Sequence, residues 1–281
     1  MPEIEINGIK TFYQIQGDGE PLVFVHGAWV THRVWDKQVD YFRGNYRVLT
    51  YDLRAHGQSG GVADENYTVE LLADDLNELL SILSIERPVI CGISLGGLVT
   101  QVYSIKYLDN IKAQILVDTQ VSSAHTLSYI LLKYILLPKH SLFLMIRAMG
   151  LERYVDFVFE LAHSSNHENW LGVNRDTREY LKQEILKYKM REEEFINILD
   201  AIYKFDLPHP AVIEVPTLVV NGEYESPFVF KHLEEVKSRL RDFSTVVIPH
   251  AGHNSNLENP VEFNKTLEEF LDSDSFNGSF S

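Results

Sequence analysis

The sequence predicts an α/β fold built on a mostly parallel β-sheet, with one inserted helical unit. Short apolar runs, which are typical of strands buried on both faces, alternate with segments of helical periodicity along most of the 281 residues. Strand–helix–strand alternation of this kind favours a parallel sheet covered by helices. One long stretch, residues 122–207, contains only helical periodicity and interrupts the alternation once.

Eight segments are predicted to form strands. The first two, residues 3–7 and 11–16, alternate apolar and polar side chains and are joined through Asn7-Gly8, which favours a β-hairpin with a type I′ turn. This hairpin should add antiparallel strands at an edge of the sheet. The other six are short apolar runs with the composition of buried strands: residues 21–25, 47–51, 88–91, 113–117, 217–220 and 245–248.

Four segments between and after these runs are predicted to be helices. Residues 68–83 carry apolar side chains at a spacing close to the helical period, which indicates an amphipathic helix. Residues 95–107, 228–240 and 261–271 have a similar pattern, and Pro260 suits the first turn of the last helix.

The interruption at residues 122–207 predicts a helical cap over the ends of the strands, because structureless segments of that length are rare inside a compact domain. The rest of the chain then divides into a core, residues 1–121 and 208–272, and a flexible polar tail, residues 273–281. Within the cap, the very apolar stretch at residues 127–145 favours packing on the core, with contact to a membrane surface as the alternative.

Composition excludes several classes of function. Lys and Arg number 25 against 40 Asp and Glu, a net charge of −15 that would repel phosphate backbones, so no nucleic-acid partner is expected. A single cysteine excludes an intrachain disulfide framework and a metal site of several cysteines. The acidic opening segment lacks a secretory apolar region, and no apolar run approaches the roughly 20 residues of a membrane-spanning helix. We expect a cytoplasmic monomer or homodimer without stable membrane insertion, whose partner is a small-molecule substrate.

The strongest chemical signal is the segment 92–97, GISLGG, which lies between a predicted buried strand and a predicted helix. A G-x-S-x-G pattern in that position predicts a tight turn that holds Ser94 in a strained conformation, with its hydroxyl pointing out of the sheet. Bulky side chains at Gly92 and Gly96 would collide across such a turn. The start of the following helix brings backbone N–H donors next to the hydroxyl. We therefore expect Ser94 to be a nucleophile.

A serine nucleophile at neutral pH needs a base, and the base needs an acid to orient it. His253 follows the last strand run in a loop, and the carboxyl ends of parallel strands share one edge of a sheet, so it can reach Ser94. Glu225, three residues after the turn at Gly222, is the favoured acid. Asp118, which ends another strand run, is the alternative acid.

Acyl transfer also requires donors for the developing oxyanion. The residue after the nucleophile, Leu95, should supply one N–H, and Ala28 in the loop after the third strand should supply the other. His26 in the same loop is interpreted as a structural hydrogen-bonding residue. The histidines show no spacing of metal ligands, so neither a metal nor a cofactor is expected. Candidate walls of a substrate pocket are His26, Trp29, Tyr129, Phe143, Phe157 and Trp170.

Five segments together resemble the α/β-hydrolase family, and they occur in the order typical of that family: residues 26–29 (HGAW), 52–59 (DLRAHGQS), 92–97 (GISLGG), 221–225 (NGEYE) and 251–254 (AGHN). The resemblance covers nearly the whole chain and implies an eight-stranded, mostly parallel sheet flanked by helices, with the triad order Ser, acid, His. It is closest to serine-nucleophile, carboxylesterase-like members with a helical cap. Two positions depart from the family pattern: Glu225 stands where Asp is usual, and Ala55 where Gly is usual.

These observations predict a serine hydrolase that cleaves a small, mostly apolar carboxylic ester through an acyl-enzyme on Ser94. The resemblance leaves the bond type open, because the same constellation serves C–C bond, lactone and thioester hydrolases. A ligand receptor that retains the triad is the alternative from another class. Multiple turnover on short p-nitrophenyl esters would distinguish an enzyme from such a receptor.

Overall fold

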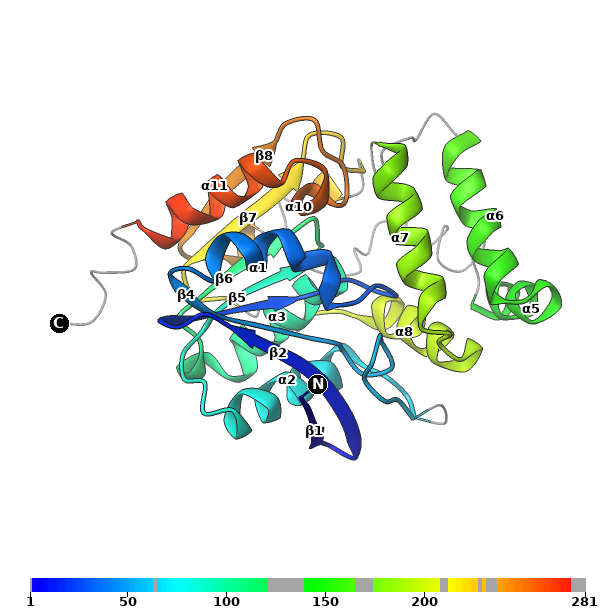
Figure 1. The fold of residues 1–281 in the computed structure, drawn as a ribbon, viewed down its shortest axis with the longest axis horizontal. Coiled ribbons are helices and arrows are strands. Elements are labelled where there is room, and N and C mark those ends of the chain that lie inside the picture. Colours follow the sequence, from blue (N-terminus) through cyan, green and yellow to red (C-terminus); the bar gives the residue numbers. More distant parts are fainter. Residues whose placement is uncertain are drawn as a thin grey trace.

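An eight-stranded sheet runs through the molecule with the strand order β1-β2-β4-β3-β5-β6-β7-β8 (Figure 1). The computed structural model describes residues 2–62, 65–120, 139–164, 174–207, 212–226, 229–230 and 237–273. The six strands from β3 onward pair in parallel, whereas β2 is antiparallel to both neighbours, which confirms the predicted mostly parallel sheet. The strands are β1 (Glu3–Ile6), β2 (Ile9–Gln16), β3 (Glu20–Val25), β4 (Tyr46–Tyr51), β5 (Val89–Ile93), β6 (Ala113–Val117), β7 (Thr217–Gly222) and β8 (Phe243–Ile248).

The amino-terminal hairpin forms one edge of this sheet. Asn7 and Gly8 have φ angles of 44° and 79°, the left-handed values that a type I′ turn requires at both central positions. Pairing of Glu3 with Phe12 and of Ile6 with Ile9 sets the register of the two strands. The local turn chemistry therefore determines how the chain enters the sheet.

Two hydrophobic clusters lie on opposite faces of the sheet, because side chains alternate along each buried strand. In β3, Val23 and Val25 belong to one cluster and Leu22 and Phe24 to the other. Helices cover both clusters: α2 (Val69–Ile82) and α3 (Leu95–Lys106) cover the first, and α1 (Asp36–Phe42) and α11 (Pro260–Leu271) cover the second.

Three of the predicted helices agree with α2, α3 and α11 to within one residue at each end. Of the predicted helix at residues 228–240, only residues 229–230 and 237–239 fall in helical parts that the structure describes. The sequence did not predict α1 or the 3₁₀ turn η1 (His32–Trp35) before it. The seven residues of α1 contain only Val39 and Phe42 as buried apolar positions, too short a pattern to show a period.

Four helices lie between β6 and β7 in the described residues, drawn in green and yellow-green in Figure 1. Ile198 and Ala201 of the last of these helices pack into the first core cluster, while Phe195 and Ile196 pack with Ile146 in a separate cluster of the cap. This helix therefore joins the cap to the core. The cap helices are α5 (Lys139–Met149), α6 (Leu151–Ser164), α7 (Arg175–Lys187) and α8 (Glu192–Lys204).

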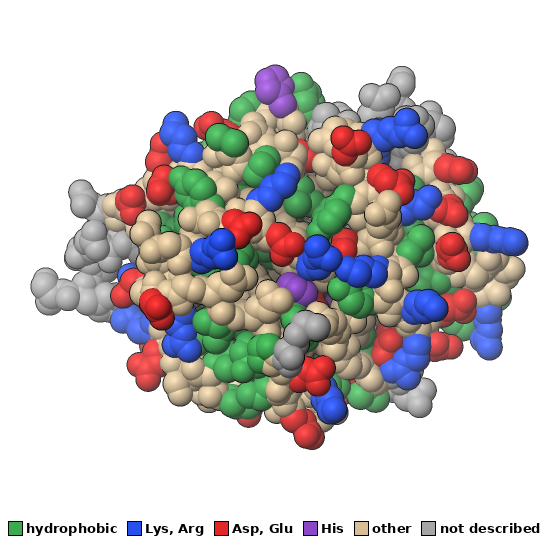
Figure 2. Space-filling model, in the orientation of Figure 1, with side chains coloured by type: hydrophobic (Ala, Val, Ile, Leu, Met, Phe, Trp, Pro, Cys, Tyr) green, Lys and Arg blue, Asp and Glu red, His purple; other side chains and the backbone are tan. Residues whose placement is uncertain are grey.

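Within the described ranges, no helix combines the length and the apolar character needed to cross a lipid bilayer. Acidic and basic side chains are interspersed over the face drawn in Figure 2, with hydrophobic side chains scattered between them. The net negative charge is therefore not gathered into a single patch on this face.

Candidate active site

The turn between β5 and α3 holds Ser94 in a backbone conformation that residues other than glycine rarely adopt. Its φ is 53° and its ψ is −116°. A Cβ atom at Gly92 would lie 2.2 Å from the carbonyl oxygen of Gly96, and one at Gly96 would lie 2.2 Å from the carbonyl oxygen of Val25. Close backbone packing therefore requires glycine at both positions.

Ser94, His253 and Glu225 form one hydrogen-bonded chain. The Nε2 atom of His253 lies 3.1 Å from the Ser94 Oγ atom, and its Nδ1 atom lies 2.7 Å from the Glu225 Oε2 atom. An Nδ1–H that donates to Glu225 leaves Nε2 free to accept the Ser94 hydroxyl proton. The Glu225 side chain is 0% exposed and that of His253 is 25% exposed, so the carboxylate is fully buried whereas the imidazole is partly accessible to solvent.

The electrostatic environment of His253 favours its protonated form. Burial lowers the pKa of His253, but the charge of Glu225 and the hydrogen bond to its carboxylate outweigh burial and raise that pKa to about 9. The carboxylates of Asp118 and Glu258 act in the same direction. A positive charge on the imidazole is therefore stabilised at this position.

Glu225 reaches His253 because the chain turns sharply after β7. Its N–H donates to the carbonyl oxygen of Gly222 at 3.1 Å, and the N–H of Tyr224 donates to the carbonyl oxygen of Ala251 at 2.8 Å. The second carboxylate oxygen, Oε1, accepts the N–H of Ser226 at 2.6 Å. These bonds place the longer glutamate side chain so that it spans to the imidazole at this position of the sheet.

Asp118, the alternative acid, has a different set of partners. Its Oδ1 atom accepts the N–H of Gly222 at 2.8 Å, and its Oδ2 atom accepts the N–H and the hydroxyl of Ser255 at 3.0 and 2.6 Å. Asp118 thus ties the loop that carries Glu225 to the loop that carries His253. Burial and the nearby charge of Glu225 raise the pKa of Asp118 to about 7.

The loop after β3 passes beside the serine, as the expected oxyanion site requires. A Cβ atom at Gly27 would lie 3.4 Å from the Cβ atom of Ser94. Within the described residues, the N–H groups of Ala28 and Leu95 donate to no other backbone group. Both predicted donors therefore remain available to an oxygen atom bound next to Ser94.

His26 holds this loop in place and is not a wall of a pocket, contrary to one of the two expectations for it. The side chain is fully buried; its Nδ1–H donates to the carbonyl oxygen of Gly27 at 2.7 Å, and its Nε2 atom accepts the N–H of Leu53 at 3.0 Å. Burial and the neighbouring His56 lower the pKa of His26 to about 3, so the ring is neutral. With both nitrogens engaged and no exposed surface, it cannot contact a substrate.

Trp29 connects the same loop to the cap. Its indole ring stacks on Phe195 of α8 at a centroid distance of 4.5 Å, and its Nε1–H donates to the Phe195 carbonyl oxygen at 3.2 Å. Thr31 makes a second contact, because its hydroxyl donates to Glu184 of α7 at 2.8 Å. The cap therefore rests directly on the loop that carries Ala28.

The other expected pocket walls lie on the insertion. Phe143 packs in the cap cluster under the guanidinium of Arg147, which is 5.3 Å from the ring centroid, and Phe157 on α6 is 42% exposed. Tyr129 and Trp170 lie outside the described residues. A role for these four side chains in a pocket stays a prediction.

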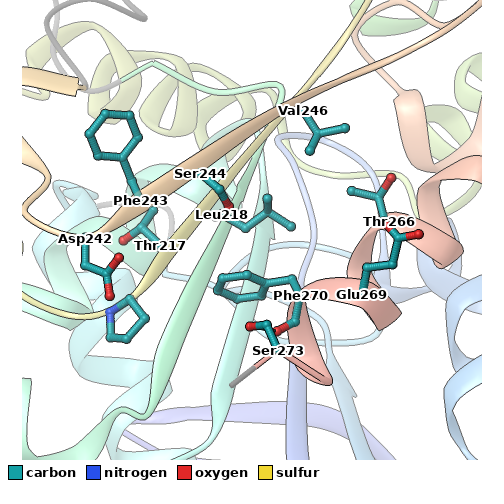
Figure 3. Close-up of a pocket in the computed structure, with 11 residues that line it drawn as sticks. Thr217, Leu218, Asp242, Phe243, Ser244, Val246, Thr266, Glu269, Phe270 and Ser273 are labelled. Atoms are coloured by element: carbon teal, nitrogen blue, oxygen red, sulfur yellow. The ribbon is translucent and has the colours of Figure 1, made fainter. Parts of the chain in front are cut away.

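A cavity of about 330 Å³ lies away from this site, between α11 and the first residues of β7 and β8 (Figure 3). Leu218, Val246 and Phe270 line it together with the polar Thr266 and Glu269. Thr217 and Phe243 are the first residues of their strands, whereas Ser94 follows the last residue of β5. The cavity therefore lies at the amino-terminal ends of the parallel strands, and Ser94 lies at their carboxyl ends. Among the described residues, no three His, Cys, Asp or Glu side chains form a group that could hold a metal ion.

Two contributions to the site were not predicted from the sequence. Thr119 donates its hydroxyl to the Ser94 carbonyl oxygen at 2.7 Å and so supports the turn from β6. Glu258 accepts the N–H of Gly252 at 2.7 Å, next to His253. Both residues bind backbone groups, and such contacts leave no signal in a sequence. Asp118 did have a signal, its position at the end of a strand.

Comparisons with known proteins agree with this fold. A sequence model of a family described as alpha/beta hydrolase fold matches residues 20–260. The chain is 26% identical to 3-oxoadipate enol-lactonase 1 of Acinetobacter baylyi, over 96% of this chain and 92% of that protein. A thermophilic esterase from Thermogutta terrifontis superposes with a TM-score of 0.80 at 23% identity, covering 96% of this chain and 98% of that one. An enol-lactonase from Burkholderia xenovorans superposes with a TM-score of 0.79 at 24% identity, covering 97% and 100%.

Proposed function

The chain belongs to the α/β-hydrolase fold family, and we propose that it is a serine hydrolase that cleaves a small, mostly apolar carboxylic ester through an acyl-enzyme on Ser94. Hydrolysis as the reaction class is supported by the family and by the activities named for its relatives. The observation that carries the finer proposal is the unbroken hydrogen-bonded chain from the Ser94 hydroxyl through His253 to Glu225.

In the proposed acylation step, the Nε2 atom of His253 accepts the hydroxyl proton as Ser94 Oγ bonds to the ester carbonyl carbon. Negative charge moves to the carbonyl oxygen, where the N–H groups of Ala28 and Leu95 stabilise it. The tetrahedral intermediate then collapses. The bond to the leaving alcohol breaks, and the imidazolium returns the proton to that alcohol.

In the proposed deacylation step, neutral His253 removes a proton from water as the water oxygen attacks the acyl-enzyme carbonyl. The Ser94 Oγ–carbon bond then breaks, the serine regains its proton from the imidazolium, and the carboxylic acid leaves. Glu225 keeps its charge throughout and holds the ring in one tautomer. The α8 and α7 helices, through Trp29 and Thr31, hold the oxyanion loop and limit access of bulk water.

Lactone hydrolysis is the second candidate, favoured by the enol-lactonase relative that aligns with 96% of this chain. A lactone is a cyclic ester, so the same nucleophile, base and oxyanion donors would open it. The two candidates differ only in whether the leaving alcohol stays tethered to the acyl group.

The test is steady-state turnover by the pure protein on p-nitrophenyl acetate and butyrate, beside a panel of lactones, thioesters and vinylogous diketo acids. We expect many turnovers per molecule on a simple ester or lactone, and a fall of at least about 10⁴-fold in Ser94→Ala, because the nucleophile is lost. Turnover that survives in Ser94→Ala would contradict the proposal. Binding without turnover in the wild-type protein would favour a receptor.

A further inference from the structure

Glu258 joins the histidine loop to the cap. It lies at the end of α10 (Ser255–Glu258), the short helix that follows His253. Its Oε2 atom accepts the N–H of Gly252 at 2.7 Å, and its Oε1 atom accepts the N–H of Asn174 at 3.1 Å. One carboxylate thus bridges two segments that are far apart in the sequence.

The first of these bonds restrains the base directly. Gly252 is buried and immediately precedes His253, so its N–H cannot form a hydrogen bond with bulk water if the carboxylate is removed. A buried N–H without an acceptor is costly, and the backbone would move to satisfy it. Such a movement would shift the His253 ring relative to Ser94, from which its Nε2 atom is now 3.1 Å away.

The second bond reaches the start of a cap helix. Asn174 is the N-cap residue of α7, and its own side chain accepts the N–H of Thr177 at 2.7 Å. Further along the same helix, Glu184 accepts the hydroxyl of Thr31 at 2.8 Å. A single cap helix therefore contacts both the histidine loop and the loop that carries the oxyanion donor Ala28.

We propose that Glu258 is a positioning residue that aligns His253 with Ser94 when α7 is docked on the core, an inference that rests on the proposed serine-hydrolase function. Docking of α7 brings the base loop and the oxyanion loop into their working positions together. Displacement of α7 loosens the base loop through Glu258. The cap thereby controls catalytic geometry.

The experiment compares Glu258→Gln with Glu223→Gln. Glu223 also accepts a backbone N–H of the histidine loop, that of His250 at 2.8 Å, but it makes no contact with the cap among the described residues. In Glu258→Gln one oxygen can serve only one of the two N–H groups, so we expect kcat to fall about 10- to 100-fold, as a small misplacement of a catalytic group does. KM should change by less than about threefold, and Glu223→Gln should retain kcat to within about twofold.

A pH profile separates positioning from general loss of structure. Among the described residues, the carboxylates of Glu225, Asp118 and Glu258 raise the pKa of His253. Removal of one negative charge in Glu258→Gln should therefore move the rising limb of kcat/KM to lower pH. Glu258→Asp keeps the charge but is too short to reach both N–H groups. It should leave the limb in place and still lower kcat.

Hydrogen exchange gives a readout that needs no substrate. In Glu258→Gln, amides in residues 250–257 and in the first turn of α7 should both exchange faster. Glu223→Gln keeps an oxygen that can accept the single N–H of His250, so both segments should exchange nearly as in the wild-type protein. Full kcat and an unchanged pH profile in Glu258→Gln, with a fully active wild-type protein, would overturn this inference alone. Absence of turnover in the wild-type protein would instead overturn the proposed function. Even then, wild-type exchange rates at both segments in Glu258→Gln would contradict the proposal that Glu258 links the histidine loop to α7.

Discussion

Two buried carboxylates lie close to the imidazole of His253, and their hydrogen bonds give them different tasks. Glu225 bonds to the ring, whereas Asp118 bonds to the backbone of Gly222 and to Ser255. Position in the sequence brings both acids to the same edge of the sheet, so the sequence alone left them as alternatives. Their hydrogen-bond partners distinguish them: Glu225 lies 2.7 Å from Nδ1 of His253, whereas both oxygens of Asp118 accept hydrogen bonds from other residues.

The pair Glu225→Gln and Asp118→Asn tests this division of tasks. Glu225→Gln should lower kcat about 10⁴-fold with little loss of stability, because glutamine no longer fixes the tautomer of His253 or stabilises its positive charge. Asp118→Asn should instead lower stability and have a much smaller effect on kcat. One of its two backbone interactions is lost, so the free energy of unfolding should fall by about 1–3 kcal/mol, while kcat stays within about tenfold of wild type.

The pH dependence of these variants has a defined sign. His253 must be neutral to accept a proton, and its pKa of about 9 means that kcat/KM of the wild-type protein should rise until about that pH. Without the negative charge of Glu225 the pKa falls, so the rising limb of Glu225→Gln should lie at lower pH. A large loss of kcat and a shifted rising limb of kcat/KM in Asp118→Asn, together with an active Glu225→Gln, would show that Asp118 is the acid that orients His253.

At the scale of elements, the turn from β5 into α3 was predictable because its requirements are local. The glycines, the preceding apolar run and the following helical period all lie within a short segment. The short helix α1 was not predictable in this way. Its position depends on packing of Val39 and Phe42 against α11 and the sheet, which no local pattern records.

Gly96→Ala tests the close packing of this turn. The added methyl would lie 2.2 Å from the carbonyl oxygen of Val25, a backbone atom that cannot rotate away. We expect a loss of about 1–3 kcal/mol in denaturant unfolding, from overpacking, and a severe loss of turnover as Ser94 moves. Gly44→Ala is the matched control: nothing lies within 4 Å of its added methyl, so the change should stay within about 0.5 kcal/mol. Equal stability of the two variants would contradict the packing argument.

At the scale of the whole molecule, the site is assembled from loops at the carboxyl ends of β3, β5, β6, β7 and β8. This assembly could be predicted, because parallel strands bring their carboxyl ends to one edge whatever the intervening sequence. The packing of the cap on the core could not be predicted. It depends on single pairings between distant residues, such as Trp29 with Phe195 and Glu258 with Asn174, and each partner alone is an ordinary side chain or backbone group.

Reaction of the folded protein with a fluorophosphonate, followed by peptide mass spectrometry, tests the central claim most directly. The reagent bonds to a serine oxygen only when a base removes the hydroxyl proton, so it reports an activated nucleophile without knowledge of the substrate. We predict one adduct, on Ser94, formed at least about 10³-fold more slowly in His253→Ala and absent from protein unfolded in guanidinium. An unlabelled Ser94 in the folded protein, or equally fast labelling in His253→Ala, would contradict the account.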